Sequence, residues 1–315
     1  MKQFHTPFLT GLLVFLFFAT SGQSQQFPIR TTAMMNPFQD HPAMAGVLGC
    51  MDLHMGYRNQ WSGIEGAPQT SFANLHGQMT AQGQDFHGFG GRVESDEAGA
   101  WGYTSVNFAY AYNLRLSTGA RLAMGFSAGF FQHRLDLSLL DMPEVQGTND
   151  PAIMGSSQFI APMLDAGVWF YDRTKYVGLT IQNVTQPSME KISQYGKLRR
   201  HVVMMAGSEV ELDGQWMFLP SGQVRMAKGV PISAELMAMA RYNDVAGVGI
   251  GYRTQSAFIV AAQIKVLEYL SIGYAYEMNV SPLSGAGPRT HEIVIGINGC
   301  SGKPSGRTMP CPAYN

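Results

Sequence analysis

A histidine and a glutamate stand side by side near the end of the chain, a pair that could supply a general base and a general acid. The predicted element around His291 and Glu292 is a strand, in which adjacent side chains point to opposite faces. The two groups therefore cannot act together, and we expect one of them to satisfy a polar partner in the interior. The sequence has no Gly-x-Ser-x-Gly nucleophile motif, and its eight His residues lack zinc-ligand spacing. We expect no catalytic site, no cofactor and no metal site.

A second group of polar residues lies where the first predicted strand ends. Arg58 could clamp a carboxylate in a polar interior or hold the next loop, with Gln60 beside it and Trp61 covering it. We favour a satisfied network at a barrel mouth over direct contact with a partner. Pro68 and Thr70 are expected to set the start of the second strand.

Alternation with a period of two residues defines the elements that must position these groups. Large apolar side chains alternate with Ser, Ala, Asn and Gly over 106–114 and 122–130, and the pattern returns over 246–253 and 270–277. Strands with one apolar face and one small or polar face fit this rhythm, whereas helical spacing does not.

The composition favours a membrane barrel over a soluble sheet. Charged residues make up 14% of the chain and the net charge is -1, yet there are 36 Gly, 18 Phe, 13 Tyr and 4 Trp. A soluble protein carries about a quarter charged residues, and a helical bundle needs apolar runs of about 20 residues. Asp165, Arg253 and Glu277 fall on the inward face, where we expect ion pairs because charge facing lipid is costly. The near-neutral balance excludes nucleic-acid binding.

The predicted fold is all-β, a closed antiparallel transmembrane β-barrel of about 14 strands with both ends in the periplasm. The strand that ends at Pro220 has weak boundaries, so the acceptable range is about 12–16 strands. The predicted strands are 47–57, 70–79, 85–94, 101–114, 120–131, 160–171, 175–184, 201–212, 215–220, 231–241, 245–253, 257–266, 269–277 and 289–297.

The connections between these strands alternate in length, as in bacterial outer-membrane barrels. The short periplasmic turns are 80–84, 115–119, 172–174, 213–214, 242–244 and 267–268, and the long outer loops are 58–69, 132–159, 185–200 and 278–288.

The N-terminal residues indicate export. An apolar core from Phe8 to Ala19 follows a basic start and precedes small and polar residues. It is too short to span a bilayer, so we predict a signal peptide over 1–25, with an uncleaved anchor as the alternative.

The rest of the chain divides around the barrel. The prolines of 26–46 disfavour a central strand, so this stretch is either a periplasmic lead-in or a plug in the lumen. The barrel spans 47–297, and 298–315 forms a periplasmic tail.

Three cysteines fit an oxidising compartment. The spacing of Cys300 and Cys311 suits a local disulfide in the tail, and two free thiols are the alternative. Cys50 is then left over as a small residue on a strand.

Four sequence blocks, in order across nearly the whole mature chain, resemble the PorP/SprF family of the type IX secretion and gliding machinery. Their matching residues include Pro42 and Gly46 in the first block, with His41 in place of the family's usual Asn; Tyr57, Arg58, Gln60, Trp61, Pro68 and Thr70 in the second; Gly90, Gly91, Asp96 and Gly99 in the third; and His291 and Glu292 in the last. We expect these residues to serve structural or partner contacts.

The resemblance implies a non-enzymatic barrel in the cell outer membrane that acts as an accessory or anchor. Its partners would be outer-membrane lipid, periplasmic secretion or peptidoglycan-linked proteins, and a secreted surface adhesin. The alternative is a transport barrel for small or hydrophobic solutes, in the manner of fatty-acid channels. A third hypothesis, a membrane-barrel enzyme, needs a clustered Ser/His or Asp/His set that the sequence does not show.

Overall fold

The alternating segments form one antiparallel sheet in the computed structural model, which describes residues 28–79, 85–117, 119–136, 139, 158–188, 197–280 and 289–299. The strands are β1 (Asp52–Ser62), β2 (Gln69–Met79), β3 (Phe86–Ala98), β4 (Trp101–Ser117), β5 (Ala120–Leu135), β6 (Gln158–Asp172), β7 (Lys175–Gln182), β8 (His201–Ser208), β9 (Val210–Glu211), β10 (Trp216–Ala227), β11 (Val230–Tyr242), β12 (Ala246–Arg253), β13 (Ala257–Leu267), β14 (Leu270–Asn279) and β15 (Arg289–Asn298). Among the described residues, no helix is long and apolar enough to cross a membrane.

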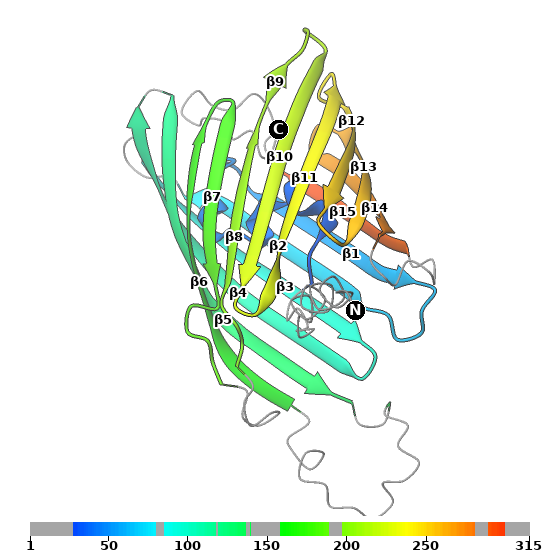
Figure 1. Ribbon diagram of the computed structural model, residues 1–315. Coiled ribbons are helices and arrows are strands. Elements are labelled where there is room, and N and C mark those ends of the chain that lie inside the picture. The colour runs from blue at the N-terminus through cyan, green and yellow to red at the C-terminus, as the bar shows by residue number, and fades with distance from the viewer. Residues whose placement is uncertain are drawn as a thin grey trace, which may run out of the picture.

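The sheet closes because its last strand pairs with its first (Figure 1). β1 and β15 run antiparallel from Asp52 opposite Asn298 to Asn59 opposite His291. β8 and β9 both lie along β10 and form one strand of the wall, so the fifteen strands make a barrel of fourteen. The prediction of a closed antiparallel barrel with about 14 strands is confirmed.

The two faces of the wall divide the residues as the alternation predicts. Phe108, Leu236 and Ile250 point away from the lumen and are 71%, 69% and 69% exposed. On the same strand as Phe108, Ala109 and Ala111 alternate with the outward residues and are buried on the inner face. An apolar band on the outside of a barrel is the surface that lipid tails cover.

The predicted strand boundaries differ most from the structure at β1 and β10. β1 begins at Asp52 and not at 47, because the chain still turns through hydrogen bonds such as Gly49 N–H to Gly46 O, 3.0 Å. β10 continues beyond Pro220 to Ala227. β8 reaches only to the position opposite Ser221, and β9 begins opposite Phe218, so Pro220 lies in the gap between them. A proline is tolerated there because no ladder bond requires its missing N–H.

The longest connections lie at one end of the barrel, which also has the two-residue turns 99–100 and 228–229. Residues 136–157 and 183–200 connect strands at this end, whereas the chain needs only residues 118–119, 173–174 and 268–269 to turn at the other. Bacterial barrels place long loops outside the cell. We therefore name the long-loop end the outer end and the opposite one the periplasmic end.

Residues 28–51, named the plug here, lie inside the barrel (Figure 1). They form three short 3-10 helices, η1 (Thr31–Met34), η2 (Pro37–Gln39) and η3 (Pro42–Met44). Pro37 and Pro42 each begin a helix, where no N–H is needed. The sequence left two alternatives for this stretch, a periplasmic lead-in or a plug. The part that the structure describes lies within the lumen, as a plug does.

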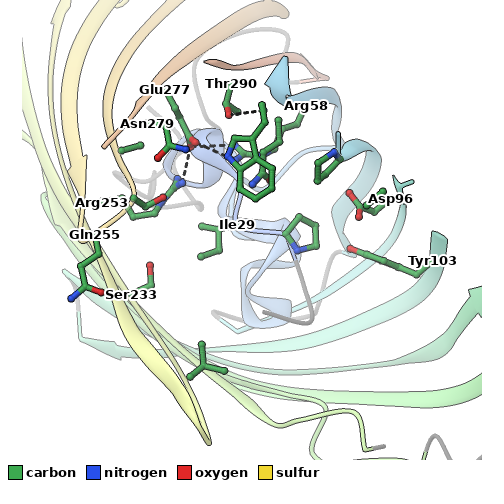
Figure 2. Close-up of a pocket in the computed structure, with 18 of the residues that line it drawn as sticks. Ile29, Arg58, Asp96, Tyr103, Ser233, Arg253, Gln255, Glu277, Asn279 and Thr290 are labelled. Carbon is green, nitrogen blue, oxygen red and sulfur yellow. Dashed lines mark hydrogen bonds and ion pairs between the residues drawn. The ribbon is translucent and has the colours of Figure 1, made fainter. Parts of the chain in front are cut away.

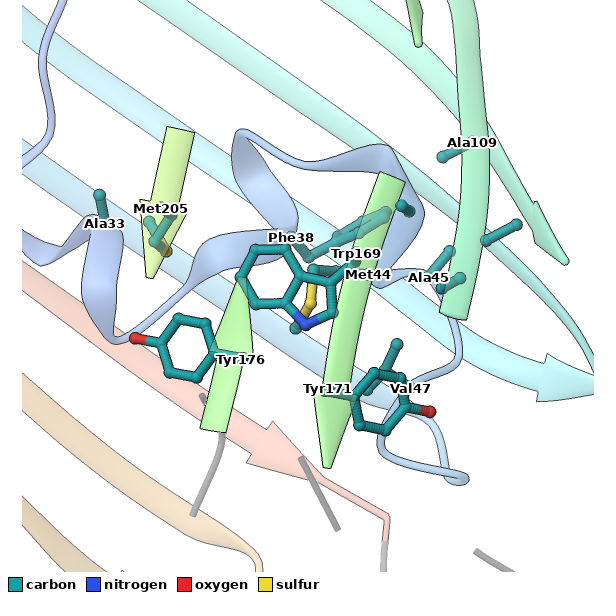
Figure 3. Packing of buried hydrophobic residues seen from close by; sticks show 13 residues of the cluster. Ala33, Phe38, Met44, Ala45, Val47, Ala109, Trp169, Tyr171, Tyr176 and Met205 are labelled. Carbon is teal, nitrogen blue, oxygen red and sulfur yellow. The ribbon is translucent and has the colours of Figure 1, made fainter. Parts of the chain in front are cut away.

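The plug packs against aromatic and very small residues of the wall (Figure 3). Phe38 and Met44 join a buried cluster with Trp169, whose ring stacks on Tyr176 at 5.1 Å. A Cβ added at Gly125 would lie 2.6 Å from the Cα of Ala43. The small inward face is therefore required by close approach of the plug backbone, and not only by a polar lumen.

The plug runs the length of the lumen. Pro28 and Ile29 line a cavity together with Trp61, beyond which lies the β1–β2 loop of the outer end. At the periplasmic end, the carbonyl of Met51 accepts a hydrogen bond from the N–H of Gly299, 2.7 Å. The described chain therefore begins at the outer end, whereas β1 begins at the periplasmic end.

We expect an epitope tag inserted before Pro28 to be stained by antibody on intact cells, because this position lies at the outer end. The same tag after Gly299 should be stained only after the outer membrane is permeabilised. Immunofluorescence of both strains measures the difference. Staining of the Gly299 tag alone on intact cells would contradict this orientation.

Cys50 is disulfide-bonded, so the prediction that it is the unpaired cysteine is wrong. The chain contains 3 Cys, and a bond to Cys50 is incompatible with a Cys300–Cys311 bridge in the same molecule. Both tail cysteines lie outside the described residues. Sequence spacing misled the prediction because strand pairing, and not closeness in the chain, brings the start of β1 next to the end of β15.

The β1–β15 register, in which Asp52 lies opposite Asn298, leads us to expect Cys300 as the partner of Cys50. Peptide mapping without reductant should recover that pair. Replacing Cys50 by Ser should lower the free energy of unfolding by about 2–4 kcal/mol, because the bond restrains the unfolded chain. Cys311→Ser is the matched control and should change little. Recovery of a Cys50–Cys311 peptide would contradict the assignment.

Candidate functional site

A buried network joins the first and last strands of the barrel to each other. Arg58 of β1 lies directly opposite Glu292 of β15, and its Nη1 is 3.2 Å from Glu292 Oε2. The same Nη1 is 3.1 Å from Oε1 of Glu277, on β14 (Figure 2). Arg253 of β12 forms a second ion pair with Glu277, at 2.7 Å. The strands that close the barrel therefore share one set of paired charges.

The same network holds the start of the plug. The backbone N–H of Thr31 donates to Glu292 Oε2 at 2.7 Å, and that of Thr32 donates to Oε1 at 3.2 Å. The hydroxyls of Thr31 and Thr32 donate to Glu277 and Glu292. The first N–H groups of a helix have no partner within the helix, so a carboxylate at this point satisfies them.

A second group of charges holds the middle of the plug. Arg30 pairs with Asp40, also in the plug, and with Glu94 of β3. Arg225 of β10 reaches Asp40 from another part of the wall. The Nη1 of Arg92 donates to the backbone carbonyl of Gln39 at 2.7 Å. The plug is thus attached to strands on different sides of the lumen.

The charges on the inward face confirm the expected ion pairing. Asp165 pairs with Arg92, and Arg253 pairs with Glu235 and Glu277. These groups are buried, and a buried ion is tolerated only where a partner of opposite charge and hydrogen bonds compensate for the loss of water. These ion pairs therefore have a structural role in the lumen.

His291 and Glu292 point to opposite faces, as the strand geometry requires. His291 contacts the outward-facing Tyr274, whose hydroxyl is 2.7 Å from its Nδ1, while Glu292 is buried in the lumen. In the described part of the chain, no group of three His, Cys, Asp or Glu side chains is placed to hold a metal ion.

The second motif block forms the β1–β2 hairpin. Its side chains are divided between the outer face of the barrel wall and the lumen. The hydroxyl of the exposed Tyr57 donates to Gln69 at 2.9 Å, on the opposite face from Arg58. Gln60 N–H donates to the carbonyl of Pro68 at 2.9 Å, which closes the hairpin. Thr70 lies opposite Arg58 and faces the lumen.

The first motif block lies in the plug. Pro42 begins η3, and Gly46 has φ 74°, a conformation that favours glycine. A Cβ at Gly46 would also lie 2.8 Å from the Cα of Gly88 on β3. Both motif residues therefore shape the plug, and neither faces a solvent-filled site.

Sequence reasoning missed the plug residues that form the site. Arg30 and Asp40 were not singled out, because nothing in the sequence decided whether the stretch entered the lumen. Arg92 and Glu94 could have been found, since both fall on the glycine-rich inward face of β3. A charge at such a position signals a partner across the lumen.

This architecture, a filled barrel of fourteen strands with an apolar exterior, defines an outer-membrane barrel. The family model described as type IX secretion system membrane protein PorP/SprF matches residues 22–297. The chain belongs to this family, and the resemblance of its sequence blocks is confirmed.

Solved outer-membrane barrels are similar to the chain at low identity. The outer membrane protein Omp33 of Acinetobacter baumannii has 7% identity and a TM-score of 0.49, with 80% of this chain and 99% of that chain covered. The CymD monoaromatic hydrocarbon channel has 11% identity and a TM-score of 0.47, covering 88% and 94%. The Pseudomonas putida toluene transporter TodX has 8% identity and a TM-score of 0.46, also covering 88% and 94%. No curated protein matches the sequence.

Replacing Arg58 by Met should lower the free energy of unfolding by about 3–5 kcal/mol, because Glu277 and Glu292 would lose a buried cation. Urea titration of the detergent-solubilised barrel, followed by its heat-modifiable gel mobility, measures the change. The matched control is Arg134→Met, which removes the exposed pair with Glu97 and should cost about 1 kcal/mol or less. Equal losses in the two variants would contradict the role of the buried network.

Proposed function

We propose that this protein is a non-enzymatic barrel that anchors components of type IX secretion or gliding at the outer membrane. The observation that carries the proposal is the filled lumen. The plug is buried and is held to the wall by Arg30 with Glu94, Asp40 with Arg225, and Thr31 with Glu292. A barrel filled in this way is suited to a rigid support. The family to which the chain belongs supports the connection to type IX secretion.

The periplasmic end offers a surface for machinery proteins. The β9–β10 hairpin extends at this end (Figure 1), and Leu212 at its tip is 62% exposed. The ion pair between Glu209 and Arg241 attaches the hairpin to β11. Together with the other periplasmic turns and the tail after 298, this hairpin supports contact with periplasmic, peptidoglycan-linked proteins. The long outer loops support contact with a secreted adhesin.

The filled lumen speaks against the alternative, a channel for small or hydrophobic solutes. Phe38 and Met44 are fully buried among wall residues, and Arg225 reaches across to Asp40. A solute path would have to displace these contacts. We therefore expect liposomes that contain the wild-type protein to show no swelling in sugar solutions, while liposomes with an open porin swell.

Affinity purification from outer membranes in mild detergent tests the proposed function directly. The tagged wild-type barrel should bring down large secretion or adhesin proteins, identified by mass spectrometry. Another tagged barrel from the same membranes is the control for non-specific recovery. Repeated recovery of the protein alone, together with liposome swelling, would contradict the anchoring function and favour a transport channel.

A further inference from the structure

A cavity of about 750 Å³ lies in the lumen at the outer end, above the plug (Figure 2). Ile29 of the plug lies in its middle, between Asp96 and Tyr103 on one side and Arg253 and Gln255 on the other. We name it the outer cavity. Its volume is in the range of sites that hold a compact ligand or a few side chains.

The base of the outer cavity is closed. Arg58 lies at its wall and pairs with Glu292, which in turn binds the backbone of Thr31 and Thr32. A ligand that enters from outside therefore meets the plug and stops. This geometry fits a binding site for a ligand at the cell surface better than it fits part of a transport channel.

Among the described residues, one carboxylate of the outer cavity, that of Asp96, forms no ion pair. Arg58 and Arg253 are neutralised by Glu277 and their other acidic partners. Asp96 accepts a hydrogen bond from the Thr70 hydroxyl at 2.5 Å, and no basic side chain among the described residues forms an ion pair with it. The unbalanced group in this cavity is thus an anion, which favours a cationic guest.

Aromatic side chains line the same cavity as this carboxylate, and Tyr103 lies directly opposite Asp96 in the sheet. Trp61, Trp101 and Tyr103 all line the cavity. Trp61 lies within a break in the β1–β15 register and has φ 55°, a strained value for a bulky residue. Its N–H donates to the Thr290 hydroxyl at 3.2 Å. Strain of this kind is retained where surrounding structure imposes it, often at a binding site. Indole and phenol faces attract cations.

A histidine also lines the outer cavity. The Nδ1 of His133 has no hydrogen-bond partner among the described residues, and this atom is buried from solvent. Trp101 packs edge-on against this imidazole at 5.0 Å between ring centres. The cavity therefore combines apolar and aromatic walls with a few polar side chains, as ligand sites do.

From these observations we propose that the outer cavity binds a basic side chain, arginine or lysine, flanked by apolar residues in a polypeptide held at the cell surface. Asp96 pairs with the cation, and Trp61 and Trp101 cover it. This inference rests on the proposed function, because it names the chemistry by which the barrel would hold a secreted partner.

Two model peptides test the inference on the purified full-length barrel in detergent. The probes are acetyl-Phe-Arg-Phe-amide and its citrulline analogue, which keeps the shape of arginine without its charge. Calorimetric titration should show binding of the arginine peptide, with the citrulline peptide about tenfold weaker. In Asp96→Asn the two peptides should bind equally weakly.

The adjacent Glu97 supplies the matched control, because its side chain is exposed and pairs with Arg134. Glu97→Gln should keep the preference for arginine. Equal binding of the two peptides to the wild-type barrel, or binding of neither, would overturn the inference, and this comparison stands even where Asp96→Asn fails to fold. Binding that appears only after residues before Ile29 are removed would also overturn it, since the chain's own N-terminal end would then be the occupant.

The test separates this inference from the proposed function. An Asp96→Asn barrel that loses peptide discrimination and still co-purifies with secretion proteins supports both. A wild-type barrel that co-purifies with them but does not distinguish the peptides retains the anchoring function and loses the cavity assignment.

Discussion

The carboxylate of Glu292 connects the two features on which the rest of the structure depends. It pairs with Arg58, so that the last strand and the first share a buried charge pair, and it accepts the N–H groups of Thr31 and Thr32. One carboxylate therefore takes part both in closing the barrel and in docking the plug. A buried carboxylate would be costly alone, and these partners determine where both the strand and the plug must lie.

The plug also explains why the wall has so many small inward residues. Its backbone approaches β3 and β5 closely enough that side chains at Gly88 and Gly125 would collide with Ala45 and Ala43. Aromatic residues such as Trp169 fill the remaining space. The outer face needs only a continuous apolar surface. The inner face therefore requires small side chains, whereas the outer face requires apolar ones of any size. That division produces the alternation in the sequence.

The alternation predicted the strands, their number and their faces because these depend on neighbouring residues within each strand. It placed Asp165 and Glu277 inside for the same reason. The pairing of Arg30 with Glu94, and the disulfide at Cys50, depend instead on which distant segments meet across the lumen or along the closing seam. The conformation of Trp61 likewise follows from its contact with Thr290, and no local pattern records it.

Hydrogen–deuterium exchange of the purified barrel tests the central claim, that paired charges fix the plug within the lumen. Amides of the plug, such as those of Thr31 and Thr32 bound to Glu292, should exchange as slowly as amides of β1 and β15. Exchange of the plug at the rate of an unstructured chain, with the strands still protected, would contradict it.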